Sequence, residues 1–187
     1  MRMITRIANC LAGCCLLALA STVVFAQAAA PGKPAVGSLV APAQVFGKML
    51  SGVEGEFVSA AEAMPDDKYD FAPTQGEFKG VRSFGEQVKH VAEANYHIFH
   101  DASKPMADHS AEFAKLKTKA EIVKALKESF AVAHAYVDGI TAENAFVMTG
   151  NGTRAGMAAM GIEHCMDHYG QMVEYLRMNG IVPPASR

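Results

Sequence analysis

Apolar residues recur at helical spacing in four segments of the chain, separated by polar or proline-containing stretches. The segments cover residues 43–64, 83–100, 118–137 and 153–179. In the first of them Phe46, Leu50, Val53 and Phe57 share one stripe, as in a helix with one face in a core. The sequence contains no evident strand series or internal repeat. The pattern therefore predicts an all-α antiparallel four-helix bundle around a single core.

Capping residues indicate where the predicted helices begin and end. Three sites carry N-terminal signals: the capping boxes Ser83–Glu86 and Thr118–Glu121, and Thr153 as an N-cap. Pro65 ends the first segment, because proline cannot continue the helical hydrogen-bond ladder, and Gly180 is expected to cap the last. Inside the last segment stand Gly156, Gly161 and Gly170, each costing about 1 kcal/mol relative to alanine in an exposed helix. These glycines predict close approach of another helix.

The first 26 residues have the order of a secretory signal peptide. Arg2 and Arg6 form a positive region, an apolar run follows, and Val24 and Ala26 occupy the small-residue positions before a cleavage site. We therefore expect cleavage after Ala26, a tether over residues 27–42 and the bundle over residues 43–187. The rival interpretation is a membrane-spanning helix, but no basic flank follows the apolar run. The expected product is periplasmic or secreted, with no stable membrane span after processing.

A lipid anchor is the alternative way of processing this segment. Leu11–Cys14 matches a lipoprotein cleavage box, which would place the lipid on Cys14. Only a short apolar stretch precedes Cys14, and another apolar run follows it, so cleavage after Ala26 is favoured.

Cleavage after Ala26 would also change the cysteine and charge inventory. Of four cysteines only Cys165 would remain, which excludes an intramolecular disulfide. The product would have 15 basic and 19 acidic residues, a net charge of −4. Without a basic field we expect no binding to nucleic acid. The expected partner is a small-molecule substrate or ligand, and a homodimer is left open.

Histidines are the candidate metal ligands. His164 and His168 are four residues apart, so they lie one turn apart on one helical face, about 6 Å along the axis. His90, in the second segment beside the core positions Val88 and Val91, could complete a set of three. The residues alone leave another interpretation open, in which His90 is a core-border histidine hydrogen-bonded to a neighbour, because an unpaired imidazole is costly to bury.

Three parts of the chain share their order of residues with one known family. The last segment contains His164-x-x-x-His168, Gly170-Gln171, Tyr175-Leu176-Arg177, Gly180 and Pro183-Pro184. This motif resembles the C-terminal signature of the DinB/YfiT-like superfamily. Residues 64–73 resemble the family's connector after its first helix, and residues 84–95 resemble its second helix. The resemblance spans residues 43–184 and implies a four-helix bundle that holds one divalent metal ion through His90, His164 and His168.

Three neutral imidazoles would leave a coordination position for water or a substrate, whereas structural zinc sites are usually closed by four protein ligands. Imidazole ligation suits zinc, nickel or iron, as well as copper, so the identity of the metal stays open. We expect a metal-dependent enzyme of transferase or hydrolase type, with no substrate or catalytic residue assigned. The alternative is a non-catalytic, stress-associated protein that binds a metal or a small ligand.

Several neighbours of these histidines have expected roles. Candidates to orient the rings, by helical spacing, are Glu93, Gln171 and Tyr175. Cys165 is rotated by about 100° from His164 and is expected to be a small buried hydrophobe, not a ligand. Glu163 and Asp167 are expected to face away from the site.

Overall fold

The computed structural model describes residues 33–187. The chain divides into a first unit, Met1–Val36, and a second, Gly37–Arg187, which contains the helices and strands described below. The predicted cleavage after Ala26, the alternative lipid on Cys14 and the beginning of the tether lie outside the described residues. No helix within residues 33–187 is long and apolar enough to cross a membrane.

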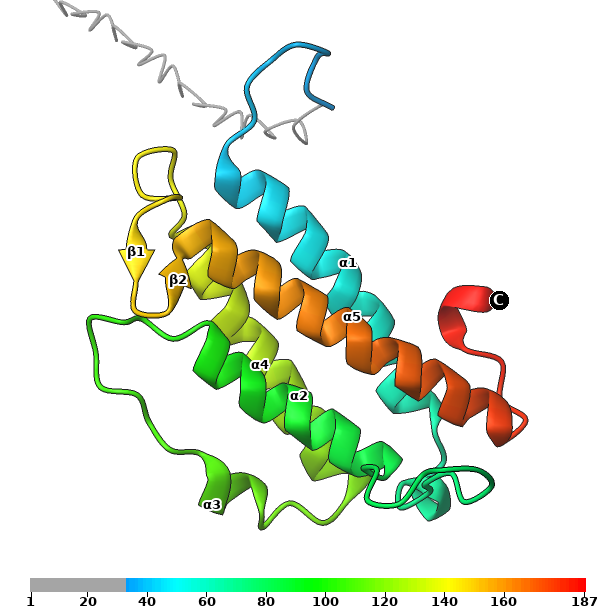
Figure 1. The fold of residues 1–187 in the computed structure, drawn as a ribbon. Helices are drawn as coiled ribbons and strands as arrows, with labels where there is room; N and C mark the ends of the chain where they lie inside the picture. Colours follow the sequence, from blue (N-terminus) through cyan, green and yellow to red (C-terminus); the bar gives the residue numbers. More distant parts are fainter. Residues whose placement is uncertain (1–32) are drawn as a thin grey trace, which may run out of the picture. The chain divides into compact units, whose positions relative to one another are not determined.

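Long helices form the body of the second unit (Figure 1). They are α1 (Pro42–Ala63), α2 (Phe84–Ile98), α4 (Lys119–Asp138) and α5 (Arg154–Met178). The shorter elements are η1 (Asp66–Lys68), α3 (Ser110–Phe113), β1 (Met148–Thr149), β2 (Gly152–Thr153) and η2 (Pro184–Ser186). The prediction of a mostly helical fold is confirmed. The single-turn helix α3 and the hairpin of β1 and β2 go beyond that prediction.

The four long helices share one core. Each packs against two of the others. Fully buried apolar side chains come from every one of them: Leu50, Phe57, Val88, Leu126, Phe130, Met172 and Leu176. Burying one such side chain contributes about 1.5–3 kcal/mol, so this core is the main source of stability and the support for the polar groups described below.

Two of the helix contacts are antiparallel. Between α2 and α5, Gln87 lies beside Gln171 and His90 lies beside His164, so residue numbers rise along one helix and fall along the other. Ion pairs between α1 and α4 follow the same rule. The predicted antiparallel arrangement is right for these two contacts.

The other two contacts are parallel. Between α2 and α4, Asn95 bonds to Ser129 and Phe99 packs on Tyr136, so residue numbers rise along both helices. It follows that α1 and α5 also run in the same direction, as Figure 1 shows. The prediction of antiparallel neighbours is wrong here because the connection over residues 99–118 returns along the length of α2 before α4 begins.

Local capping agrees with the sequence. Both predicted capping boxes are complete. Thr153 Oγ1 accepts the backbone N–H of Gly156 at the start of α5. After the end of α5, Gly180 adopts a φ of 72°, in the left-handed region that favours glycine.

Close approach of a neighbouring helix is confirmed at one of the three glycines in α5. A side-chain carbon at Gly161 would overlap the ring of Phe99, which follows α2. The prediction is wrong for Gly170, which faces open space, and for Gly156, where the nearest atom is Oγ1 of its own N-cap Thr153. Gly161 therefore lets α2 and α5 approach closely, just before the first histidine of α5.

Candidate metal centre

The antiparallel contact between α2 and α5 brings three histidines together. His90 comes from α2, and His164 and His168 come from successive turns of α5. Nε2 of His164 lies 3.2 Å from Nε2 of His90. One nitrogen from each of the three rings lies within 4.8 Å of the others, and the ring centroids are 4.6–5.1 Å apart. Three histidines placed in this way could hold a metal ion.

The distance between two of the rings is compatible with a shared ion. Two nitrogens bound to a tetrahedral zinc ion at about 2.0–2.1 Å lie about 3.3 Å apart, close to the 3.2 Å between His90 and His164. The second ring nitrogen of His164, Nδ1, is buried and has no hydrogen-bond partner among the described residues. Leaving a buried polar atom unpaired costs about 1–3 kcal/mol. The His164 ring is therefore not fully satisfied by the hydrogen bonds around it.

A chain of side-chain amides fixes the tautomer of His168. Nδ1 of His168 donates to Oε1 of Gln87 over 2.6 Å. Nε2 of Gln87 then donates to Oε1 of Gln171 over 2.8 Å, and Nε2 of Gln171 donates to Oδ2 of Asp167 over 3.2 Å. Because the carboxylate can only accept, every bond in the chain has one direction. Nδ1 of His168 therefore carries the proton, and Nε2 offers its lone pair to the other two histidines.

Burial keeps all three imidazoles neutral. It lowers the pKa of His168, together with the neighbouring His164 and His90, to about 4. Burial is also the main cause of the lowered pKa of His90 and of His164. Asp167 is exposed and is not hydrogen-bonded to a histidine of the described chain, but its charge raises the pKa of both histidines of α5 and offsets part of this effect. At neutral pH the lone pairs of the rings are available to a metal.

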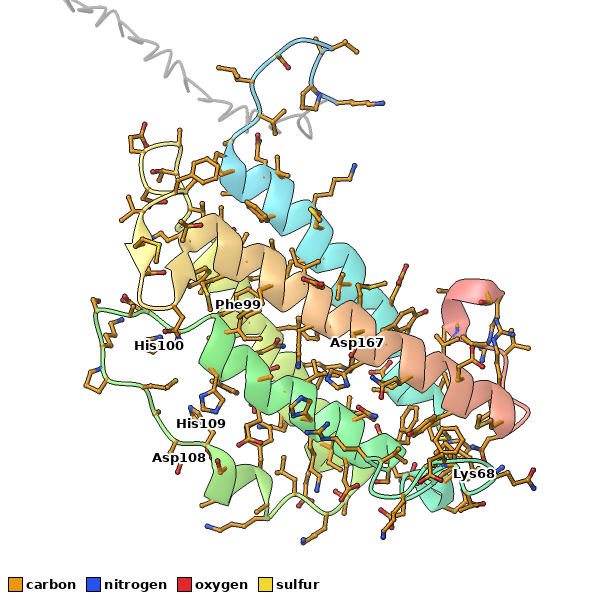
Figure 2. The ribbon with its side chains drawn as sticks, viewed as in Figure 1. Lys68, Phe99, His100, Asp108, His109 and Asp167 are labelled. Atoms are coloured by element: carbon orange, nitrogen blue, oxygen red, sulfur yellow. The ribbon has the colours of Figure 1, made fainter. Side chains whose placement is uncertain are left out.

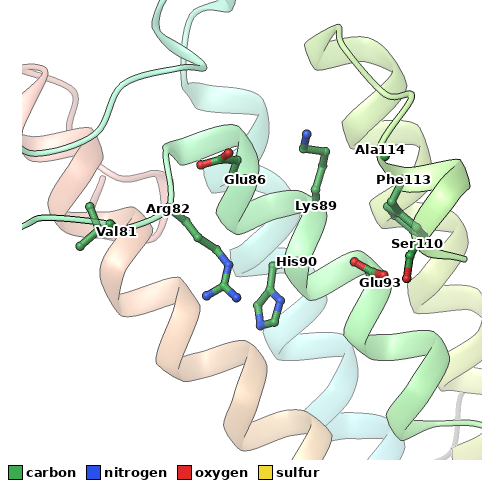
Figure 3. Close-up of a pocket in the computed structure, with 10 residues that line it drawn as sticks. Val81, Arg82, Glu86, Lys89, His90, Glu93, Ser110, Phe113 and Ala114 are labelled. Atoms are coloured by element: carbon green, nitrogen blue, oxygen red, sulfur yellow. The ribbon is translucent and has the colours of Figure 1, made fainter.

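A groove of about 530 Å³ opens beside His90 (Figure 3). Its walls come from the segment before α2, from α2 itself and from α3, and its charged side chains are Arg82, Glu86, Lys89 and Glu93. Figure 3 shows the guanidinium of Arg82 turned toward the His90 ring. The positive charge of Arg82 contributes to the lowered pKa of all three histidines. His90 is therefore reachable by a small molecule from the α2 side.

Comparison with known proteins identifies the family. The model of the DinB superfamily matches residues 49–172, about two thirds of the chain. The chain belongs to the DinB superfamily. A crystal structure of a protein assigned to the DinB family from Exiguobacterium sibiricum 255-15 is similar, with a TM-score of 0.59 and 17% identity. The likeness covers 76% of this chain and 95% of that one, and it shows the shared fold. No curated protein matches the chain.

Gln87 and Arg82 are parts of this DinB-superfamily site that the sequence did not single out. Gln87 is 2% exposed and stands three residues before His90, on the same face of α2. A polar residue at a core position was the available signal. Gln171 was expected to orient a ring, but it contacts no ring directly: it accepts a hydrogen bond from Gln87, which in turn bonds to His168. Tyr175, the other candidate on α5, donates to the backbone oxygen of Arg82 and not to a ring.

Other histidines of this DinB-superfamily chain, and its buried cysteine, do not join the centre. Figure 2 shows His100 and His109 on the connection between α2 and α4, away from Asp167 on α5. Cys165 is fully buried, and its Sγ lies 3.6 Å from Oδ1 of Asn95. Burial raises the pKa of this thiol to about 12, so it stays protonated. Cys165 behaves as the small core residue that its position on α5 predicted.

Proposed function

We propose that this DinB-superfamily protein binds one divalent metal ion through His90, His164 and His168 and offers the open coordination position to a small molecule in the groove. The observation that carries the proposal is the convergence of three neutral ring nitrogens, with the tautomer of His168 set by Gln87. The alternative of a core-border histidine accounts for the 3.2 Å between Nε2 of His90 and Nε2 of His164, but it gives no role to the third ring nitrogen, which lies within 4.8 Å of the other two. Zinc, nickel and iron suit an all-imidazole donor set.

A metal-dependent enzyme of transferase or hydrolase type is the function that these residues support best. When bound, the ion would supply Lewis acidity toward an oxygen or sulfur of the small molecule. Glu93 lines the same groove as His90, and its carboxylate makes no hydrogen bond or ion pair among the described residues. It is therefore available to accept a proton from a bound substrate.

The alternative is a non-catalytic protein that binds a metal or a small ligand with the same three histidines. A screen for metal-dependent turnover of small esters and thiols, run on the parent and on Glu93→Gln, separates the two functions. Loss of turnover in the variant with unchanged metal content supports the enzyme. Absence of turnover by either protein supports the binder.

Metal analysis tests the site itself. After loading with zinc and dialysis, the protein should hold one ion per chain, and its melting temperature should rise with added zinc. Each of His90→Ala, His164→Ala and His168→Ala should weaken binding more than about a hundredfold, because even an outer partner of a ligand is worth about 10–100-fold. His97→Ala is the matched control, since Nδ1 of His97 contacts Sδ of Met106 instead. Parent-like zinc affinity in His90→Ala would contradict the three-histidine site.

We also propose that the protein acts outside the cytoplasm, in the periplasm or after secretion. The support is the order of charged, apolar and small residues that ends at Ala26. The intact mass of native protein tests this: the proposal expects a chain that begins at Gln27. A mass that includes Met1 would overturn export by cleavage, and a diacylated Cys14 would replace the free form with a lipid-anchored one.

A further inference from the structure

Two cationic side chains line the groove, and one of them, Arg82, lies beside His90. Arg82 directly precedes Ser83, the N-cap of α2, and Lys89 directly precedes His90. In the described part of the chain, neither the Arg82 guanidinium nor the Lys89 ammonium makes a hydrogen bond or an ion pair. The guanidinium points toward the His90 ring (Figure 3). It is therefore free to bind a ligand that reaches the three-histidine site.

Charge balance favours an anion at this place. Three imidazoles are neutral ligands, so they would leave the full positive charge of a divalent ion uncompensated. Arg82 adds a further positive charge close enough to affect all three rings. Asp167 offsets part of this charge, but its carboxylate accepts a hydrogen bond from Gln171. An acidic group in the groove would be attracted by both the ion and Arg82.

The other lining residues narrow the chemistry of that anion. Glu86 and Glu93 also line the groove, and their charges disfavour a ligand with several negative charges. Val81 and Phe113 offer apolar contact to the body of the molecule. Arginine matches the planar geometry of a carboxylate with two parallel hydrogen bonds.

We propose that the groove selects small molecules that carry one carboxylate, and that Arg82 binds this carboxylate beside the metal ion. The inference rests on the proposed metal site and names the class of ligand for it. Arg82 is thus a specificity-determining residue that attracts the ligand and, before the ligand arrives, weakens the binding of the metal.

Binding of benzoate to the cobalt(II)-loaded protein tests the proposal, with the visible absorption of cobalt as the readout. Benzoate should bind at least about tenfold more weakly to Arg82→Gln than to the parent, because a charge-assisted bidentate bond is lost. Arg82→Lys, which keeps the charge but not the fork, should be intermediate. In buffer without carboxylates, Arg82→Gln should bind cobalt more tightly than the parent. Lys48→Gln, an equal change of charge on the exposed face of α1, should leave both affinities unchanged.

The decisive result is that Arg82→Gln changes two affinities in opposite directions: cobalt binds more tightly and benzoate binds more weakly than in the parent. Equal benzoate affinity in the parent and Arg82→Gln would overturn the role of Arg82. Benzamide, the neutral analogue, binding as tightly as benzoate would overturn the selection for a carboxylate. Both of these outcomes would leave the metal site standing, whereas absence of cobalt from the parent would overturn the metal site and this inference together. Arg82 is exposed, and circular dichroism of each variant checks that the helices are intact.

Discussion

The molecule contains two antiparallel helix contacts with ionisable side chains, α1–α4 and α2–α5, and they satisfy histidine in different ways. In α1–α4, Nε2 of His134 lies 2.8 Å from Oε2 of Glu54. In the same contact, Nζ of Lys127 lies 2.6 Å from Oε1 of Glu62. Each of these two basic groups therefore has a carboxylate of its own, and this contact needs no further partner.

The α2–α5 contact has three histidines, and no carboxylate of residues 33–187 is hydrogen-bonded to them. The ring of His168 donates to the neutral amide of Gln87, and His90 and His164 face each other. The difference shows that the partner, more than the helix position, decides what a histidine in a bundle can do. Paired with Glu54, His134 is a structural residue, whereas the three histidines of α2–α5 keep lone pairs for a cation.

Acid should destabilise the metal-free protein through the buried histidines of the α2–α5 contact, and this is the largest effect that we expect. The pKa of His168 is lowered from 6.5 to about 4 in the folded chain. As pH falls, the unfolded chain therefore binds a proton first, and stability is lost between about pH 6.5 and about pH 4. The expected loss of unfolding free energy from His168 is on the order of 3 kcal/mol.

Urea unfolding of the metal-free protein across this pH range measures that loss. His168→Gln is the matched variant, since it keeps a polar side chain but cannot titrate, and its stability should decline less steeply with acid. Equal declines in the parent and in His168→Gln would mean that folding does not hold His168 neutral.

Removal of the amide partner should have the next largest effect. Gln87→Leu keeps the side chain's approximate size but deprives Nδ1 of His168 of its acceptor, so zinc affinity should fall by about 10–100-fold. Gln171→Leu acts only through Gln87 and should weaken zinc binding less. Competition with a chelator measures both affinities. If Gln171→Leu were the more damaging of the two, the order of the amide chain would be wrong.

The smallest effect is expected in the α1–α4 contact. Glu54→Gln removes the charged partner of His134, in a pair whose side chains are about one third exposed. The unfolding free energy should fall by about 1 kcal/mol or less, and zinc affinity should stay unchanged. Chemical unfolding and zinc titration of the same preparation check both statements. A parallel loss of zinc affinity would show that the two contacts are coupled.

Helix boundaries could be predicted from the sequence because they depend on residues close in the chain. The capping boxes at Ser83 and Thr118 are short-range patterns, and both are present as expected. The direction of neighbouring helices could not be predicted in the same way. It depends on how residues 99–118 cross the molecule, and the apolar stripes are compatible with either direction.

In the candidate site too, features set within one helix could be predicted from the sequence, whereas features set by contacts between helices could not. His164 and His168 could be paired from their spacing, because one helix sets their relative position. His90 was a candidate from its position beside core residues, but only the family resemblance assigned it as the third ligand, because spacing within α2 says nothing about the helix opposite. Gln87 and Arg82 were missed because their roles arise from the contact between α2 and α5 and from the groove beside it.

The three candidate ligands come from α2 and α5, so the ion would act on some local openings of the structure and not on others. Any opening that separates α2 from α5 must release the ion, which at a thousandfold excess over its dissociation constant costs about 4 kcal/mol more. Release of α1 from the rest leaves the three ligands in place. Metal would therefore slow amide hydrogen exchange where α2 and α5 part, while amides that exchange through release of α1 keep their rates. The ion would thus stabilise the α2–α5 contact selectively, in a fold whose four long helices share one core.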